Sequence, residues 1–443
     1  MLVKNELYRV TIEDVNDLGY GVCRIDSQVV FVALGVTGDT ALVRIIKVAK
    51  TYAVARIEEL ITPSDLRVEP ACDVFRRCGG CSLLHMTDAA EKELKEGFVK
   101  SALHKAGLDI PVRELLRGKN RTHYRNKAQY PLFCDKDGHI RAGFYARHSH
   151  AAICAEKCLL QPESFTEIAT AFCKAFESAG LSCYNEEDGT GLLRHLNLRE
   201  GADGSVTAEI VINATKAQKL IPLAREVFAK FEHLKGISAN FNTEKTNVIR
   251  GRHYEVLCGE MTLTQNLCDK EFAHGPASFF QVNREAASLL FDEARRLLNA
   301  APTDAVCDLY CGVGAVGQCV APDSRIHGAD VVREAIAFAT QNATKNGCNA
   351  AYAAMDAADY FAAAGKFDAV LLDPPRAGLS DAMVDLLLNK KPKKILYISC
   401  NPATLARDLA RLTAKDYETD GITPVDLFPK TGHVEAVVLL SRK

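Results

Sequence analysis

Residues 304–317, DAVCDLYCGVGAVG, run from a short apolar segment through a glycine-rich turn into a helical pattern. Glycines at 312, 314 and 317 give the Gly-x-Gly-x-x-Gly spacing that follows the first strand of many nucleoside-binding α/β domains. From about residue 271 onward, near-continuous apolar runs alternate with helical patterns, as in a parallel, doubly wound sheet. We therefore predict an α/β domain over 271–443. The glycine spacing alone fits a dinucleotide as well as any other nucleoside cofactor.

The strand after this turn ends at Asp330, where a carboxylate can accept hydrogen bonds from ribose hydroxyls. Nicotinamide and adenosylmethionine enzymes both use that arrangement. Residues 367–380, FDAVLLDPPRAGLS, are more discriminating, because they put Asp373 and two prolines at the carboxyl end of a buried strand. A dehydrogenase has no evident use for such a rim, although an ordinary proline turn is the structural alternative. Amino methyltransferases carry an aromatic residue after a similar Pro-Pro, whereas Arg376 stands here, which favours a carbon target.

Residues 393–409, KKILYISCNPATLARDL, repeat this geometry on the next strand. Cys400 ends an apolar strand just before a proline-started helix, whose dipole is expected to favour the thiolate. A lone buried cysteine is usually inert packing, but one strand away from Asp373 it becomes a candidate nucleophile. Glu435 stands just before the last strand, and a carboxylate near a reactive thiol suggests a general base rather than a surface charge.

A second group of cysteines lies upstream in CDVFRRCGGC, with Cys72, Cys78 and Cys81 closely spaced. The segment ICAEKCLLQP offers Cys154 or Cys158 as a fourth ligand. Closely spaced cysteines in a long chain more often bind metal or catalyse than form disulfides. Four thiolates suit either zinc or a [4Fe–4S] cluster, and the five-residue gap is looser than that of a paired zinc ribbon.

The length of 443 residues predicts two or three domains. Five short alternating segments with glycine turns over 1–62 suggest a small β-barrel, and 63–270 reads as a mixed α+β region. The chain shows no membrane span and no secretory signal, so a cytoplasmic protein without membrane contact is expected. Net charge is −2, yet basic and aromatic residues interleave over 113–148, either as a strand-tracking surface for nucleic acid or as a solvated basic face.

Five ordered segments together resemble the RNA uracil-C5 methyltransferases of the RumA/TrmA type: GPASFFQVN, DLYCGVG, LLDPPRAGLS, SCNPATLARDL and FPKTGHVEAVVLL. The N-terminal barrel resembles an OB-like TRAM domain, and HYRNKAQYP, GFYARHSH and LLRHLNLREG resemble the central domain of the family. The resemblance covers essentially the whole chain. It implies a C-terminal Rossmann-like class I methyltransferase domain that uses S-adenosylmethionine.

The resemblance also implies residue roles. Cys400 is expected to add to C6 of the target uracil, Glu435 to remove the C5 proton, and Asp373 to hold the uracil edge close to the cofactor. Contacts to S-adenosylmethionine are expected from Gln281, Tyr310, Gly312, Gly314, Ala315, Asp330, Asp356 and Asp373. Relatives with this cysteine pattern carry [4Fe–4S], which implies that the ligands are Cys72, Cys78, Cys81 and Cys158.

Two positions depart from the family pattern, because Ala315 is often Asn in relatives and Asp330 is usually Glu. The combination of a TRAM-like barrel and a cysteine cluster resembles the 23S rRNA branch more than the tRNA branch, and a monomer is expected. Two alternatives stay open: a nicotinamide-dependent oxidoreductase that uses the glycine turn, and a non-catalytic RNA-binding factor built on the barrel.

Overall fold

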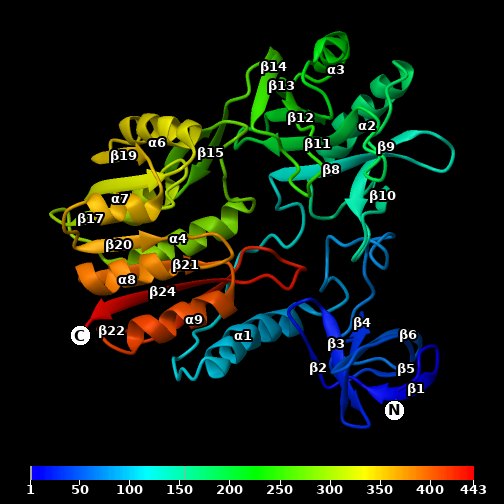
Figure 1. The fold of residues 1–443 in the computed structure, drawn as a ribbon, viewed down its shortest axis with the longest axis horizontal. Coiled ribbons are helices and arrows are strands. Elements are labelled where there is room, and N and C mark those ends of the chain that lie inside the picture. The colour runs from blue at the N-terminus through cyan, green and yellow to red at the C-terminus, as the bar shows by residue number, and fades with distance from the viewer. Residues whose placement is uncertain (1, 155) are drawn as a thin grey trace.

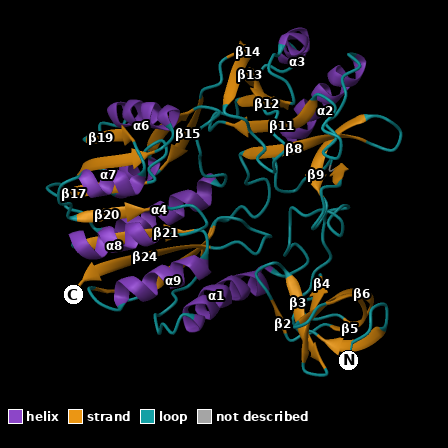
Figure 2. Ribbon diagram, viewed as in Figure 1, coloured by secondary structure: helices purple, strands orange, loops and turns teal. Residues whose placement is uncertain are grey.

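The computed structural model describes residues 2–154 and 156–443, which form three regions (Figure 1). A strand-only N-terminal region and a mixed central region lie to one side of a C-terminal region of alternating strands and helices (Figure 2). Within the described residues, no helix is long and apolar enough to cross a membrane.

The N-terminal sheet curls around its own apolar core (Figure 1). Alternation builds it: Ala41, Val43 and Ile45 are buried, while the residues between them are partly exposed. The first predicted strand is split in two, so six strands pair in the order β1-β5-β6-β4-β3-β2. They are β1 (Leu7–Thr11), β2 (Asp14–Val15), β3 (Tyr20–Ile25), β4 (Gln28–Ala33), β5 (Thr40–Val48) and β6 (Tyr52–Thr62).

The central region is a seven-stranded sheet, order β10-β9-β8-β11-β12-β13-β14, packed against helices α2 and α3. Helix α2 presents Phe165, Phe172 and Phe176 to the sheet, about one or two turns apart on one face. The elements are β8 (Lys127–Cys134), β9 (Ile140–Tyr145), β10 (Ala152–Cys154), α2 (Glu163–Ser178), β11 (Leu193–Glu200), β12 (Val206–Ile212), the 3₁₀ turn Gln218–Leu220, α3 (Ile221–Phe228), β13 (Leu234–Phe241) and β14 (His253–Gly259).

The C-terminal region is a nine-stranded sheet with helices on both faces, as predicted. Along β19-β18-β17-β20-β21 the strands are parallel, and β24 then joins β21 antiparallel. The connections reverse direction between β17 and β20, the point at which open α/β sheets bind ligands. A two-stranded hairpin, β15 (Leu263–Leu267) and β16 (Lys270–His274), leads into this region.

The bounds of the elements within it are α4 (Arg284–Leu298), β17 (Ala305–Leu309), α5 (Ala315–Val320), β18 (Arg325–Asp330), α6 (Arg333–Lys345), β19 (Ala350–Ala354), α7 (Ala357–Ala363), β20 (Ala369–Leu372), α8 (Asp381–Lys390), β21 (Lys394–Ser399), α9 (Pro402–Thr413), β22 (Tyr417–Glu418), β23 (Ile422–Asp426) and β24 (Glu435–Arg442).

Helix α1 (Asp88–Lys105) and strand β7 (Leu116–Arg117) precede the central sheet in the chain but pack on the C-terminal one. Strand β7 pairs with β23, and Val99 and Leu103 of α1 join the core that α9 also lines. The fully buried Lys95 of α1 lies 2.6 Å from Asp426 and 3.0 Å from Glu91. Because each buried charge has an opposite partner, the cost of desolvation is offset and α1 is fixed to the end of β23.

Candidate active site

The glycine turn follows β17 at the reversal point of the sheet. Gly312 and Gly314 have φ angles of +52° and +78°, and a Cβ on Gly314 would come within 2.7 Å of the Gln318 and Tyr352 side chains. Tyr310 also adopts a positive φ, +65°, which is strained for a residue with a side chain. Ala315 begins α5 directly after the turn. The residues are therefore held in a tight backbone shape that leaves open space beside Gly312.

Asp330 ends β18 beside this turn and shapes it. Its Oδ2 accepts a 3.0 Å hydrogen bond from the Gly312 N–H, and its Oδ1 accepts one of 2.9 Å from the Val332 N–H. Asp356 lies between β19 and α7 and is the N-cap of α7, where its side chain accepts a hydrogen bond from the Ala358 N–H at 2.8 Å. Both predicted acids thus lie at the sheet edge with part of their hydrogen-bonding capacity already used by the backbone.

Two apolar side chains at this edge were missed by the sequence analysis. Val331 is 66% exposed and Met355 is 44% exposed, and the Met355 N–H donates to the Asp330 carbonyl at 3.0 Å. Exposed apolar residues beside strand-end carboxylates suit a flat, apolar ring next to a polar sugar. The available signal was their position, since each immediately precedes or follows a predicted cofactor residue.

The three predicted catalytic residues converge on neighbouring strands. Asp373 follows β20, Cys400 follows β21, and Glu435 opens β24, whose Ala436 pairs with Ser399. The amino end of the antiparallel β24 therefore meets the carboxyl ends of the two parallel strands at one edge of the sheet. Each of the three side chains is buried or partly buried.

Burial raises the pKa of every member of this group, and repulsion between like charges adds to the shift for Glu435 and Cys400. Burial raises the pKa of Glu435 to about 8, with the Asp373 charge adding to the shift and Arg376 opposing it. Burial also raises the pKa of Asp373 to about 7. The pKa of Cys400 rises to about 11 through burial and then through the charges of Glu435 and Asp373. Acids with pKa values near neutrality can exchange protons with a bound substrate.

The prediction that the α9 dipole would leave Cys400 favouring the thiolate is wrong for the net effect. Helix α9 does begin at Pro402, next to the thiol, and Asn401 caps it by accepting from the Ala403 N–H at 3.0 Å. Burial and two neighbouring carboxylates outweigh this dipole, because a charge buried beside like charges is strongly disfavoured. Without bound substrate the thiol therefore keeps its proton near pH 7.

Arg376 is the cation of the group. Its Nη2 lies 3.0 Å from Nδ1 of His433, and its carbonyl accepts from the Asn401 side chain at 3.2 Å. His433 is exposed at the surface of the site, yet the surrounding protein and the Arg376 charge lower its pKa to about 4, so the ring is neutral near pH 7. In the sequence, Arg376 indicates only that the target atom is carbon. Its contact with His433, 57 positions later, leaves no pattern in the local sequence.

Gln281 lies in the segment between β16 and α4, on a cavity of about 460 Å³ shared with the cysteines. The segment is fixed by Asn126, whose side chain donates to the Gln281 carbonyl at 3.0 Å. Phe279 lines the same cavity with 66% of its surface exposed, and the sequence analysis did not single it out. A buried aromatic is ordinary, but an exposed one on a cavity wall indicates a binding surface.

The four predicted cluster cysteines, Cys72, Cys78, Cys81 and Cys158, all line this cavity. Burial and the charges of the other three raise the pKa of Cys81 to about 12, so the thiols are close enough to interact. Cys154 is on β10 and is not among the lining residues. Across residues 2–154 and 156–443, no group of three or more His, Cys, Asp or Glu side chains has the geometry to hold a metal ion.

The basic segment over 113–148 is neither one continuous surface nor a purely solvated face. Arg121 is turned inward, where it lies 2.7 Å from Glu91 and 2.6 Å from Asp426. Arg125 and Lys127 line the cysteine cavity, and burial beside Arg199 lowers the pKa of Lys127 to about 7. Part of the segment is therefore structural, and part faces the cavity next to Gln281.

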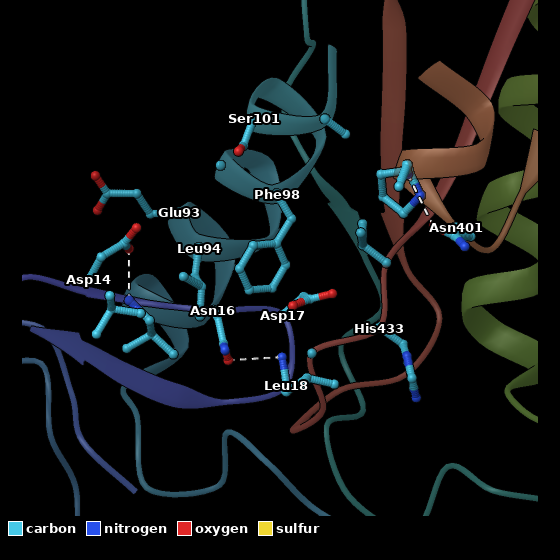
Figure 3. A pocket seen from close by; sticks show the side chains of 18 of the residues that line it. Asp14, Asn16, Asp17, Leu18, Glu93, Leu94, Phe98, Ser101, Asn401 and His433 are labelled. Atoms are coloured by element: carbon cyan, nitrogen blue, oxygen red, sulfur yellow. Dashed lines mark hydrogen bonds between the residues drawn. The ribbon is translucent and has the colours of Figure 1, made fainter. Parts of the chain in front are cut away.

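Cys400 also lines a groove of about 720 Å³. Figure 3 shows its walls: Asp17 and Leu18 of the N-terminal region, Leu94 and Phe98 of α1, and His433, two residues before β24. Cys400, Asn401 and Arg376 also line it. The Cys400 thiol therefore lies on a groove that reaches the N-terminal region.

Comparison with known proteins identifies two of the three regions. Residues 4–57 match the TRAM domain, and residues 260–443 match the family described as tRNA (Uracil-5-)-methyltransferase. An RNA methyltransferase of Bacillus cereus is 36% identical over 99% of this chain and 97% of its own length. One from Clostridium tetani is 34% identical over 99% and 97%.

A solved structure matches the whole architecture. Pyrococcus abyssi tRNA (uracil-54, C5)-methyltransferase, determined with S-adenosyl-L-homocysteine, is 27% identical and superposes with a TM-score of 0.78. The match covers 98% of this chain and 100% of that one. The RNA uracil-C5 resemblance, the TRAM domain and the use of S-adenosylmethionine are confirmed, and the nicotinamide alternative is not supported. The chain belongs to the tRNA (uracil-5-)-methyltransferase family.

Proposed function

We propose that this protein methylates C5 of a uridine in 23S rRNA through a covalent bond between Cys400 and C6 of the base. The observation that carries the proposal is the convergence of Asp373, Cys400 and Glu435 at one sheet edge, beside the glycine turn. Uracil C5 is a weak nucleophile. Addition of a thiolate to C6 converts the ring into an enolate, in which C5 is nucleophilic enough to take up a methyl group.

Each residue has a defined task in this reaction. The Cys400 Sγ forms a bond to C6 while its proton passes to the Asp373 carboxylate, which leaves Glu435 ionised for the later step. When bound, S-adenosylmethionine would supply the methyl group that C5 takes up, and S-adenosylhomocysteine would be released. Glu435 then removes the C5 proton, the C5–C6 double bond reforms, and the Cys400–C6 bond breaks. Asp373 holds the uracil edge, and Arg376 limits the repulsion among the carboxylates.

The residues at the sheet edge fit S-adenosylmethionine. Asp330 would accept hydrogen bonds from the ribose, with Tyr310, Gly312, Gly314 and Ala315 around the nucleoside and Gln281 toward the methionine part. Asp356 lies where the adenine would be held, with Val331 and Met355 as its apolar support. The S-adenosyl-L-homocysteine in the Pyrococcus abyssi structure supports this class of cofactor.

We also propose that Cys72, Cys78, Cys81 and Cys158 close around a [4Fe–4S] cluster when it is inserted, because among the described residues the four thiols do not yet stand in metal-binding geometry. Support comes from their common cavity and from the position of Cys154 outside it. Such a cluster has no evident redox task in methyl transfer, so a structural role or one in RNA positioning is expected.

The 720 Å³ groove is the proposed path for nucleotides next to the target uridine, since it starts at Cys400. Its wall combines apolar Leu94 and Phe98 with acidic Asp17 and Glu93. Carboxylates repel phosphates but accept from base N–H groups, so bases rather than backbone would face this wall. A target base that lies in a loop is easier to flip out than one in a duplex.

Transfer RNA is the second candidate substrate. The Pyrococcus abyssi tRNA enzyme covers 98% of this chain, so the presence of the barrel does not by itself distinguish the two RNAs. A parallel assay of both substrates separates them: purified protein with labelled S-adenosylmethionine should methylate 23S rRNA transcripts, and Cys400→Ala should not. Mapping 5-methyluridine in cells that lack the gene gives the same answer in vivo. Loss confined to tRNA would overturn the rRNA proposal.

A further inference from the structure

The turn that leads into the catalytic Glu435 is held from outside its own sheet. Residues 429–433 connect β23 to β24, and Lys430 within them has a φ of +68°. This left-handed conformation is unfavourable for lysine, so neighbouring groups must maintain it. The contacts around the turn therefore decide where the chain enters β24.

Three of these contacts come from the residues that follow Cys81. The Ser82 and Leu83 N–H groups both donate to the Lys430 carbonyl, at 3.1 and 3.0 Å. In return, the Gly432 N–H donates to the Ser82 hydroxyl oxygen at 2.9 Å. Three hydrogen bonds thus join the end of the cysteine segment to a turn about 350 positions later in the chain.

Other elements hold the remaining sides of the turn. The Lys430 N–H donates to Glu91 of α1 at 2.7 Å, and the Tyr124 hydroxyl donates to the Pro429 carbonyl at 3.0 Å. A Cβ on Gly432 would come within 1.8 Å of the Asp17 carbonyl oxygen of the N-terminal domain, so the backbones touch there. Every neighbouring region therefore contributes to the turn.

The cysteine segment is itself fixed to the central domain. The Arg147 guanidinium donates to the Cys81 carbonyl, and the Gly79 N–H donates to the Tyr145 carbonyl at 2.9 Å. Ser82 follows Cys81 directly, so a displacement of that cysteine moves the groups that bind Lys430 and Gly432. The position of the cysteines is thereby transmitted to the turn through one peptide bond and one side chain.

We propose that Ser82 is a positioning residue for the catalytic base: through Lys430 and Gly432, the cysteine segment holds the start of β24 in the place where Glu435 meets the adduct. Ser82 lines neither the groove nor the cysteine cavity. The proposal rests on the proposed function, because it assumes that Glu435 resolves a Cys400 adduct. It gives the cysteine cavity a conformational role in the second half of the reaction, with no electron transfer.

Hydrogen exchange measures the positioning without any need for turnover. Ser82→Ala removes the acceptor of the Gly432 N–H, so amides in a peptide spanning 428–436 should exchange roughly three- to tenfold faster, the factor expected for one hydrogen bond. Ser82→Thr keeps a hydroxyl and should restore the parent rate. Ser380→Ala is the matched control, because the Ser380 hydroxyl also accepts from a backbone N–H, that of Met383 at 3.2 Å, but at the start of α8.

The chemical readout is the lifetime of the covalent complex with RNA. With Ser82→Ala, adduct formation and S-adenosylmethionine binding should match the parent, whereas adduct release should slow several-fold, so a protein–RNA band accumulates on a denaturing gel. Unchanged exchange and unchanged release in Ser82→Ala overturn the inference. Failure of Glu435→Gln to trap any adduct instead overturns the proposed function, so the two failures are distinct.

Discussion

Replacing Glu435 by glutamine should make the C-terminal domain more stable while it stops the release of product. Glu435 is 5% exposed, and burial first, then the Asp373 charge, raises its pKa to about 8 from about 4.5 in an unfolded chain. Between these values the native carboxyl keeps a proton that the unfolded one has lost, so the native state binds more protons. Stability contributed by this group therefore falls as pH rises from about 4.5 to about 8.

The magnitude follows from the shift. A raise of about 3.5 pKa units corresponds to roughly 5 kcal/mol at pH 8 and above, at about 1.4 kcal/mol per unit, and this is an upper bound. Glutamine has the same shape and cannot ionise, so it removes this cost. The advantage of Glu435→Gln over the parent should be near zero at pH 5 and grow to a few kcal/mol at pH 8.5.

Calorimetry at a series of pH values tests this. A chain of this length unfolds in more than one transition, and the one that shifts upward with added S-adenosylmethionine belongs to the C-terminal domain. Asp308 and Asp373, whose pKa values burial raises to about 7, titrate in both proteins and largely cancel in the difference. A stability difference that does not change between pH 5 and 8.5 would refute the assignment of Glu435 as a buried acid. The same variant should accumulate the covalent RNA adduct.

Three further predictions concern the groove, the cysteines and the buried charges. Gly97 of α1 lines the groove, and a side chain added there would meet open space, so Gly97→Leu should raise the KM for RNA several-fold without loss of stability. Lys100→Leu, outside the groove, should leave the KM unchanged, and equal KM values for the two variants would argue against RNA in the groove. Cys158→Ser should abolish bound iron and sulfide in anaerobically purified protein and Cys154→Ser should not; stoichiometric zinc without iron in the parent would refute the cluster. Lys95→Met leaves two buried carboxylates short of a cation and should destabilise the C-terminal domain by about 3 kcal/mol in urea unfolding, and a stabilised variant would contradict the pairing.

The sequence predicted those parts of the site that depend on where a strand ends. Apolar runs locate the ends of β18, β20 and β21, and so placed Asp330, Asp373 and Cys400 on one edge of one sheet. It did not predict the protonation of Cys400, because that depends on how many carboxylates surround the thiol in space. It also placed Asp356 among cofactor contacts without its role as the N-cap of α7.

The sequence also did not predict contacts between segments that lie far apart in the chain. The polar pattern over 88–107 predicts a helix, which α1 forms over Asp88–Lys105, but nothing in that pattern shows that it packs on α9. The two residues of β7 are too few to produce a period-2 signal, although they extend the C-terminal sheet. The contacts of Ser82 with Lys430 likewise join segments whose proximity only the folded chain defines.

The packing of α1 and β7 on the C-terminal sheet has a consequence for how the chain is made. Ribosomes produce residues 88–117 long before β23 and α9, their partners, so Val99 and Leu103 have no native core to enter until those elements have been made. The core of the N-terminal barrel contains only residues of the barrel itself, so the barrel can fold as soon as it emerges from the ribosome. The C-terminal sheet therefore completes its core only after β23 and α9 have been made, and a fragment starting at residue 271 would leave the β23 edge uncovered.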